Sequence, residues 1–389
     1  MPIADKMVKM VAAASMIRKM FEDGIRMKEK YGAENVYDFS LGNPDVPPPF
    51  AVKETLLELI RNPETSHGYM PNAGFPRVRQ SVADYLNAEY NVGLTPDLIV
   101  MTAGAAGALN GSLRALLNPG EDILTSAPYF IGYHQYAFMT GGNLETVKSL
   151  PDFHLDLEAI QAAITKDTRV MLINSPNNPT GCVYTKEELS ALGNILDDAS
   201  RKFGKRIYLI SDEPYRKIIY DVEVPCVFDA YPHTIVLTSY SKELSLSGER
   251  IGYLAVHPKA EDAERIAGAT GMVNTMMYVN APALFQQVVG KLQGITVDIE
   301  IYRKRRDIFC EGLKAAGYEF DIPQGAFYLF PKSPIADDMK FVGILKDQNI
   351  LAVPGKGFGG PGHFRLSYAV PDETISNSLD GFKKAVNSI

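Results

Sequence analysis

The sequence predicts an α/β fold built around a mostly parallel sheet with helices beside it. From about residue 96, short apolar runs end in small, polar or turn-forming residues, and helical patterns separate several of these runs. The runs are mostly continuous rather than alternating, which is typical of strands buried on both faces of a parallel sheet. Strands that alternate with helices along the chain indicate an α/β sheet.

The apolar runs give the expected order of the elements. Strands are predicted at 97–104, 121–128, 169–176, 206–213, 234–241 and 250–257. A helix is predicted over 186–203, because Leu189, Leu192 and Leu196 fall on one stripe at helical spacing. In such a sheet, ligands bind at the carboxyl ends of the strands, so we expect any site to lie there.

The two ends of the chain follow a different pattern. The first segment, to about Tyr31, is predicted to be a helix with one apolar face, and PDVPPP at 44–49 cannot form regular structure. The apolar face consists of Met16, Ile17, Met20, Phe21 and Ile25. After about residue 300, helices are expected at 301–317, 338–347 and from about Pro371. We therefore expect a large domain over 46–295 and a smaller α+β domain from 1–45 and 296–389.

Composition excludes several classes of protein. The chain has 389 residues, 46% of them hydrophobic and 22% charged, as in ordinary globular proteins. A net charge of -7 argues against nucleic acid as a main partner. No stretch approaches the roughly 20 apolar residues of a membrane span. Cys182, Cys226 and Cys310 are too few and too widely spaced for a disulfide framework or a zinc site, so no metal is expected. A cytoplasmic protein is the expectation.

Three motifs place polar groups at strand ends, and each has a plain structural interpretation. MTAGAAGALNGSL (101–113) offers bare backbone N–H groups at a helix start, which suit a phosphate, but it is neither a Walker A loop nor GxGxxG. The alternative is a tight turn. NSPNNPTG (174–181) is either a rigid polar loop or a β-turn. In SDEPY (211–215), Asp212 either meets a cation or caps the next helix.

Lys242 lies just past another strand end, within SYSKELSLSGERIGY (239–253). A lone lysine in a polar loop is usually solvated, but this one has hydroxyl residues before it and Arg250 after it. A lysine that forms an imine, an acid that keeps a pyridine nitrogen protonated, and donors for a phosphate are together the parts that hold pyridoxal phosphate. The combined motifs therefore predict that cofactor.

In these motifs the chain resembles the fold-type I pyridoxal-phosphate enzymes of the class I/II aminotransferase family, which includes aspartate aminotransferase. The resemblance extends from LGNPD (41–45) to FRLSYA (364–369), and NNPTG, SDEPY and SYSK followed by Arg250 are specific when they occur together and in this order. It implies a large domain with a mostly parallel, seven-stranded sheet, a smaller α+β domain and a homodimer.

The resemblance implies a role for each matching residue. Lys242 resembles the lysine that binds the cofactor and moves the proton at the substrate α-carbon. Asp212 resembles the partner of the ring nitrogen, and its negative charge keeps the ring cationic. Tyr215 and Asn178 resemble the pair that bonds the cofactor's phenolic oxygen and lowers the pKa of the imine. Phe130, in APYF, matches the aromatic ring that stacks on the pyridine.

The resemblance also implies which groups bind the phosphate of the cofactor. The expected residues are Ser239, Ser241, Arg250 and the backbone at Gly104, Ala105 and Ala106. Because family members often carry a hydroxyl or larger side chain in the last stretch, the grip here rests more on the serines and on the arginine fork. Tyr69, in HGYMPNAG, matches a tyrosine that reaches the phosphate of the neighbouring subunit, which implies active sites at a dimer interface.

Substrate residues follow in the same way. Arg365, in FRLSYA, matches the arginine that clamps the substrate α-carboxylate, with Asn178 and the Gly42 backbone assisting; the alternative for Arg365 is a surface strand residue. Aspartate with 2-oxoglutarate is the first expectation for the substrates. Dicarboxylates need a cation for the second carboxylate, however, and no Lys or Arg can be assigned to it from the sequence. A segment near 17–21 and 69–70 is the expected side-chain pocket.

The sequence leaves three functions open, in decreasing order of support. The first is a ping-pong aminotransferase that acts on an amino acid and a 2-oxo acid. The second is a β-eliminating lyase on the same fold, which would release ammonia and pyruvate without an acceptor. The third is a non-enzymatic sensor fused to a DNA-binding module, which would need about 90 further residues with a helix-turn-helix that this chain does not contain.

Overall fold

The computed structural model describes residues 3–389, and within the first helix it describes no side chain at positions 5, 6, 9 and 12–21. A seven-stranded sheet, in the order β2-β8-β7-β6-β5-β3-β4, forms the centre of the molecule. All neighbouring strands run parallel except β8, which is antiparallel to both β2 and β7. The strands are β2 (Ile99–Thr102), β3 (Asp122–Ala127), β4 (Asn143–Lys148), β5 (Thr168–Asn174), β6 (Tyr208–Asp212), β7 (Thr234–Ser239) and β8 (Gly252–Val256). The predicted α/β class and mostly parallel sheet are confirmed.

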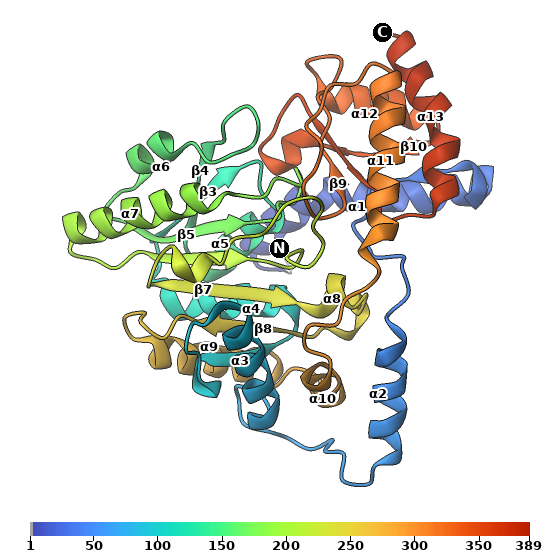
Figure 1. The fold of residues 1–389 in the computed structure, drawn as a ribbon. Coiled ribbons are helices and arrows are strands. Elements are labelled where there is room, and N and C mark those ends of the chain that lie inside the picture. Colours follow the sequence, from blue (N-terminus) through green and yellow to red (C-terminus); the bar gives the residue numbers. More distant parts are fainter. Residues whose placement is uncertain (1–2) are drawn as a thin grey trace.

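Helices cover the sheet on both sides. Figure 1 shows α6 and α7 on the upper side of the sheet and α3, α4 and α9 on the lower side, where α4 packs against β7, β8 and α9. The helices of this part of the chain are α2 (Phe50–Arg61), α3 (Pro76–Tyr90), α4 (Gly104–Leu116), α5 (Gly132–Thr140), α6 (Leu157–Ala163), α7 (Lys186–Phe203), α8 (Tyr240–Glu243), α9 (Ala263–Tyr278) and α10 (Ala283–Lys291).

Helix α7 shows why these residues form these elements. It starts at a capping box, in which Thr185 and Glu188 each bond the other's backbone N–H, and it ends at Gly204 in the left-handed conformation. The predicted stripe of Leu189, Leu192 and Leu196 is buried in the main core beside the strands. Strand β4 was not predicted, because its sequence NLETVK lies at the sheet edge with mostly exposed side chains and carries no apolar run.

The C-terminal part forms a second layer beside the carboxyl ends of the strands (Figure 1). Its elements are α11 (Ile299–Ala315), β9 (Tyr328–Leu329), α12 (Asp338–Asp347), β10 (Ile350–Leu351), β11 (Val353–Pro354), β12 (Phe364–Ser367) and α13 (Asp372–Asn387). A second hydrophobic core, which includes Phe309, Phe341, Phe364 and Phe382, holds this layer together. The predicted helices of this region are all present.

The start of the chain packs on this second layer. Helix α1 (Asp5–Tyr31) is followed by β1 (Tyr37–Asp38), which pairs in parallel with β10, and Phe39 lies in the second core. Of the predicted apolar face of α1, Ile25 is exposed, and the other four side chains lie outside those described. No regular element lies between Ser40 and Pro49, which includes the predicted irregular stretch at 44–49. This crossing segment passes the ends of the central strands. Among the described residues, no helix is long and apolar enough to cross a membrane.

Candidate active site

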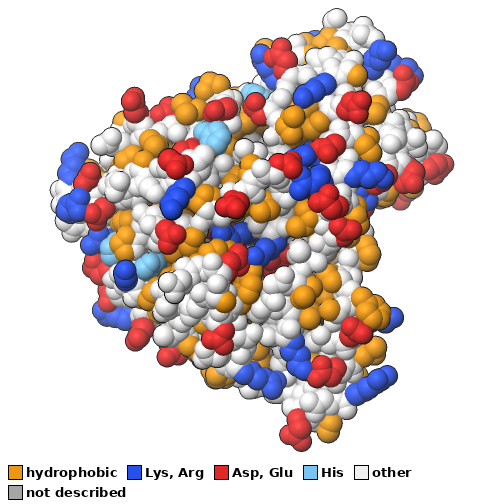
Figure 2. Space-filling model, viewed as in Figure 1, with side chains coloured by type: hydrophobic (Ala, Val, Ile, Leu, Met, Phe, Trp, Pro, Cys, Tyr) orange, Lys and Arg blue, Asp and Glu red, His pale blue; other side chains and the backbone are white. Residues whose placement is uncertain are grey.

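A cavity of about 330 Å³ lies where the ends of the central strands meet the C-terminal layer and the crossing segment. Figure 2 shows this face of the molecule hollowed between the two parts, with Lys and Arg side chains visible in the hollow. The predicted residues that line the cavity are Gly42, Ala105, Ala106, Phe130, Asn178, Asp212, Tyr215, Ser239, Ser241, Lys242, Arg250 and Arg365. Residues more than 300 positions apart in the sequence are thus brought to one place.

Two predicted residues do not line the cavity. Gly104 lies behind its wall, against Arg250: a Cβ built on Gly104 would come within 2.8 Å of the guanidinium. Tyr69 lies outside the cavity, and its side chain is 92% exposed in the single chain. Of the predicted side-chain pocket, the part near 17–21 falls outside the described side chains, and Met70, like Tyr69, does not line the cavity.

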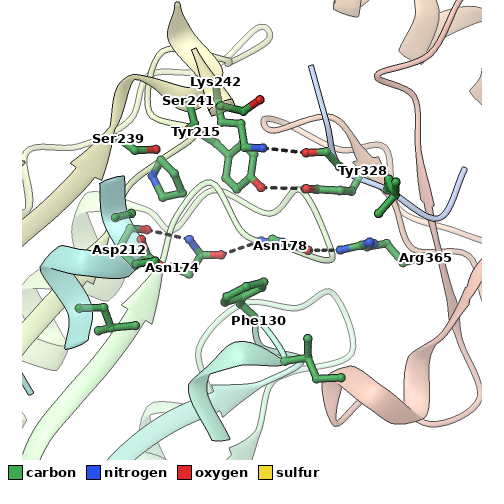
Figure 3. Close-up of a pocket in the computed structure, with 18 of the residues that line it drawn as sticks. Phe130, Asn174, Asn178, Asp212, Tyr215, Ser239, Ser241, Lys242, Tyr328 and Arg365 are labelled. Atoms are coloured by element: carbon green, nitrogen blue, oxygen red, sulfur yellow. Dashed lines mark hydrogen bonds between the residues drawn. The ribbon is translucent and has the colours of Figure 1, made fainter. Parts of the chain in front are cut away.

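Lys242 lies in the short helix α8, immediately after β7 ends at Ser239. Its Nζ donates to the carbonyl of Gly42, 2.7 Å away in the crossing segment (Figure 3). Burial, together with the positive charges of Arg365 and Arg250, lowers the pKa of Lys242 to about 8. The lysine is therefore not a solvated loop residue, and its amine loses a proton much closer to neutral pH than an exposed lysine does.

Asp212 ends the neighbouring strand β6, and no helix follows it, so it caps nothing. Its Oδ2 accepts a hydrogen bond from the buried hydroxyl of Tyr133 at 2.8 Å, while its Oδ1 is buried without a partner. Burial raises the pKa of Asp212 to about 7, with Glu213 adding to the rise and the Tyr133 bond opposing it. A buried carboxylate with one unpartnered oxygen is suited to a positively charged N–H group.

Arg365 lies on β12 in the C-terminal layer and is buried, so it is not a surface strand residue. One guanidinium nitrogen donates to Asn178 Oδ1 at 3.0 Å and another to the carbonyl of Ser40 at 2.7 Å. The guanidinium also stacks against Tyr328 and Phe358, with its carbon 4.6 and 4.8 Å from their ring centres. These contacts hold a planar cation, unpaired with any described carboxylate, in the lining of the cavity.

Asn174, Asn178 and Asp212 connect the two ends of the cavity. Asn174 Nδ2 donates to the Asp212 carbonyl at 2.7 Å, and Asn174 Oδ1 accepts from the Asn178 backbone N–H at 2.7 Å. Asn178 then accepts from Arg365, so a continuous path of hydrogen bonds links the aspartate to the arginine (Figure 3). The NNPTG loop is therefore a rigid support between the two charged groups.

At Gly104 and Gly252, other atoms approach the backbone too closely for a side chain to fit. Gly104 starts helix α4 with φ +69°, and Gly252 packs so closely that its Cβ would lie 2.9 Å from the Gly104 Cα. The free N–H groups at the start of α4 therefore lie beside the Arg250 guanidinium, and Ala105 and Ala106 line the cavity. A helix N-terminus next to an arginine and two serines is an anion site. At Gly42, a Cβ would come 1.9 Å from the Tyr328 hydroxyl.

Among the lining or supporting residues that were not predicted to take part, Ser40, Tyr133, Asn174 and Tyr328 make hydrogen bonds to predicted site residues. Tyr328 Oη lies 2.8 Å from Tyr215 Oη, and burial raises the pKa of Tyr215 well above its usual range. Asn174 carried a signal, because it is the last polar residue of β5 and pairs in register with Asp212 on β6. Ser40 contributes only its carbonyl, and nothing in the sequence near Tyr133 or Tyr328 marks the contacts they make.

Comparison with known proteins decides the family. The model of the family described as aminotransferase class I and II matches residues 33–382. The chain belongs to this family. The aminotransferase is 34% identical to the aspartate/prephenate aminotransferase of Thermus thermophilus over 355 residues, which cover 89% of each chain. It is 31% identical to the aspartate aminotransferase of Thermotoga maritima, over 91% of this chain and 92% of that one.

Solved structures similar to this chain are also those of aminotransferases. An amino transferase from Eubacterium rectale matches the whole of this aminotransferase and 99% of its own chain, with a TM-score of 0.96 and 38% identity. The aspartate aminotransferase of Thermus thermophilus, solved with maleate, matches with a TM-score of 0.86 and 28% identity over 95% of this chain and 96% of that one. This chain is thus an aminotransferase of fold type I that depends on pyridoxal phosphate.

The residues of the cavity fit that cofactor. The unpartnered Asp212 Oδ1 would accept the N–H of a pyridinium ring, and the anion site at the start of α4 would take the phosphate. The Lys242 amine lies in the same cavity, where it would meet the aldehyde carbon. The spacing glycines leave room at the phosphate end that a Cβ would fill. No described feature of the site opposes the cofactor.

Proposed function

We propose that the enzyme exchanges an amino group between an L-amino acid and a 2-oxo acid, in two half-reactions at one site. The observation that carries this proposal is the meeting of Lys242, Asp212 and Arg365 in one cavity. Each α-amino acid and each 2-oxo acid has a carboxylate next to the reacting carbon, so one arginine serves both half-reactions. Such ping-pong exchange needs no second substrate site.

Each residue of the site has a defined task in the proposal. Arg365 binds the α-carboxylate through its planar fork, and Asn178 and Ser40 keep that fork in place. Lys242, whose pKa is lowered to about 8, takes the proton from the α-carbon near neutral pH and returns it. Asp212 holds a proton on the ring nitrogen by pairing with it. Bound there, the cofactor supplies a carbonyl carbon for the amine and a ring that withdraws electrons.

Phosphate and ring contacts complete the assignment. Ser239, Ser241, Arg250 and the N–H groups at the start of α4 hold the phosphate in this proposal. Phe130, Tyr215 and Asn178 line the cavity. Phe130 would hold the cofactor ring by stacking, and Tyr215 and Asn178 would bond its phenolic oxygen. Supporting the last point, the Tyr215 hydroxyl already shares a hydrogen bond with Tyr328 inside the cavity. Aspartate and 2-oxoglutarate are the pair against which other substrates are to be compared in assays, because the named relatives are an aspartate/prephenate and an aspartate aminotransferase.

We propose that two copies of the chain form the active unit. Helix α9 exposes Met272, Met276 and Met277, and Asn280, just after α9, donates to the carbonyl of Pro71, two residues after Tyr69. The exposed methionines and Tyr69 therefore form one apolar surface, which we call the α9 face. Exposed apolar side chains gathered in this way mark an interaction surface. Through this face a second copy would bring its own Tyr69 toward the phosphate end of the cavity.

We also propose that the enzyme acts in amino acid metabolism in the cytoplasm. Cys182, Cys226 and Cys310 are all free thiols. Unpaired cysteines are usual in proteins of a reducing compartment.

The decisive test is Lys242→Ala, with the exposed Lys332→Ala as the matched control. Borohydride reduction should fix the cofactor to Lys242 in the wild type and in the control, as read by peptide mass spectrometry, and should give no adduct in Lys242→Ala. Amino transfer to 2-oxoglutarate or pyruvate from a panel of L-amino acids should fall at least about 1,000-fold in that variant. A Lys242→Ala enzyme with full activity would remove the proposal, and ammonia and pyruvate released without any acceptor would favour the β-lyase.

A further inference from the structure

Among the side chains that the structure describes, the cavity has no charged group left for a second carboxylate of the substrate. Among the described residues that line it, those with charged side chains are Asp212, Lys242, Arg250 and Arg365. The proposed function uses each of them, for the ring nitrogen, the reacting carbon, the phosphate and the α-carboxylate in turn. A substrate with a carboxylate in its side chain would therefore bury one charge without a partner at this site, which is unfavourable.

Arg365 cannot serve both carboxylates. Its guanidinium is fixed by Asn178 and Ser40 and lies between the rings of Tyr328 and Phe358. Each terminal nitrogen already donates one hydrogen bond and Nε is buried without a partner, so the donors that remain suit one carboxylate in a bidentate pair. The side chain of the substrate must therefore find its contacts elsewhere in the cavity.

Two aliphatic side chains, Leu41 and Ile131, line the same cavity as Arg365. Leu41 lies between Ser40, whose carbonyl holds Arg365, and Gly42, whose carbonyl holds Lys242, and so it stands between the two groups that bind the α-carbon's substituents. Ile131 lines the cavity next to Phe130 and packs against the cluster of Phe330, Val353 and Phe358. Both are aliphatic side chains at the place where a substrate side chain would lie, and neither can donate a hydrogen bond.

We infer that the preferred substrates are monocarboxylic amino acids with an aromatic or aliphatic side chain, and the matching 2-oxo acids, rather than aspartate or glutamate. The inference rests on the proposed function, since it takes Arg365 as the clamp of the α-carboxylate. An apolar side chain against Leu41 and Ile131 gains by leaving water, whereas a carboxylate there loses its hydration and gains no ion pair.

The α9 face is consistent with a preference for apolar substrate side chains. The Tyr278 hydroxyl, at the end of α9, accepts from the Ala103 N–H at 3.2 Å, so the α9 face adjoins the start of α4 and the cavity. The side chains exposed there, Met276 and Met277, are apolar and flexible. A second copy joined through this face would bring methionines, and no cation from this helix end, toward the rim.

Binding of unreactive carboxylates to the holoenzyme tests the inference without turnover. The probes are maleate and succinate as dicarboxylates, and 4-methylpentanoate and 3-phenylpropanoate as apolar monocarboxylates, each titrated by calorimetry. We expect the monocarboxylates to bind at least about tenfold more tightly than the dicarboxylates. Dicarboxylates that bind equally well or better would overturn the inference.

Arg365→Ala separates this inference from the proposed function. If Arg365 is the clamp, the variant binds both classes of probe at least about tenfold more weakly. If both affinities stay unchanged, the clamp is wrong, and the proposed function fails together with the inference. If both affinities fall while the wild type prefers dicarboxylates, the inference alone is overturned.

A single substitution at the wall gives a second, positive test. Leu41 is 40% exposed, so a longer polar side chain can be placed there without burying its end. We expect Leu41→Lys to raise the ratio of kcat/KM for aspartate over leucine at least about tenfold, because it supplies the missing cation. Leu41→Gln, similar in length but uncharged, should leave that ratio within about threefold. Equal ratios in the two variants would overturn the inference.

Discussion

Lys242 is a cation that the folded chain holds among other cations. Burial and the charges of Arg365 and Arg250 lower its pKa, and its amine finds a single carbonyl, that of Gly42, in place of water. Burial also shifts the pKa of Asp212, but upward, to about 7, because burial disfavours the charged form of either group. Both residues keep an unfavourable charge in the protein without cofactor, which is a cost in stability that binding can relieve.

We therefore predict that Lys242→Met stabilises the cofactor-free protein at pH 7. The lysine of the unfolded chain keeps its proton to about pH 10.5, whereas the folded one loses it near pH 8. Below pH 8 the buried charge thus lowers the free energy of unfolding, by roughly 3 kcal/mol, and this deficit shrinks as pH rises from 8 toward 10.5. Urea denaturation of both cofactor-free proteins at pH 7 and pH 10 measures it.

The control for this experiment is Lys332→Met, which changes an exposed lysine paired with Glu319. It should shift stability by less than about 1 kcal/mol at both pH values. A Lys242→Met advantage that is the same at pH 7 and pH 10 would show that lost packing strain, and not charge, is the cause.

The first residue of helix α4, Gly104, packs closely against two other segments, and this packing places the helix N-terminus at the proposed phosphate site. Gly104 touches the Arg250 guanidinium and the backbone of Gly252, and the antiparallel pairing of β8 with β2 brings Gly252 there. A side chain at Gly104 would separate the helix N-terminus from the arginine, so the anion site depends on the absence of one carbon atom.

We predict that Gly104→Ala weakens cofactor binding at least about tenfold, which is about 1.4 kcal/mol. The matched control is Gly120→Ala, because Gly120 has a similar positive φ of +84° but nothing within 4 Å of a Cβ. Both variants should lose about 1–2 kcal/mol of stability from the backbone conformation. Only Gly104→Ala should also raise the dissociation constant for pyridoxal phosphate, measured by titrating the cofactor-free protein. Equal affinity in the two variants would contradict the proposed phosphate site.

At the level of the whole molecule, the two largest hydrophobic cores among the described residues lie around the central sheet and in the C-terminal layer. The division into domains over 46–295 and over 1–45 with 296–389 stays a prediction, and the second core also contains Val46, Tyr215 and Ile218 from the larger segment. The cavity lies between the cores, so any relative movement of the two would open or close it.

We predict that the α9 face holds a dimer together. Met276 is 72% exposed in the single chain, so Met276→Glu should leave the monomer folded while charge repulsion at the interface shifts the protein to monomers. Sedimentation velocity reads the assembly. Tyr69→Phe should keep the dimer and lower cofactor affinity about threefold to tenfold, whereas Tyr31→Phe, another exposed tyrosine, should change neither. A wild type that sediments as a monomer would contradict the proposed dimer.

The sequence was sufficient for the elements whose residues carry their own signal. Buried strands such as β5 and β7 are continuous apolar runs, and α7 has both caps and a leucine stripe, so each could be predicted. Strand β4 is exposed at the sheet edge and lacks such a run. In the site, the motif residues were predicted, but the Tyr133 bond to Asp212 and the Ser40 bond to Arg365 depend on tertiary contacts that residue type does not reveal.

The path of hydrogen bonds from Asp212 through Asn174 and Asn178 to Arg365 has one more consequence. Because every link is buried and short, the guanidinium stands at one set separation from the ring end of the cavity. If Arg365 binds the α-carboxylate, as proposed, we expect this separation to disfavour homologated compounds such as β-alanine or 4-aminobutanoate, whose amine lies one or more carbon atoms farther from the acid group. In that proposal, Asn174 and Asn178 would help to set which carbon of a substrate lies at Lys242.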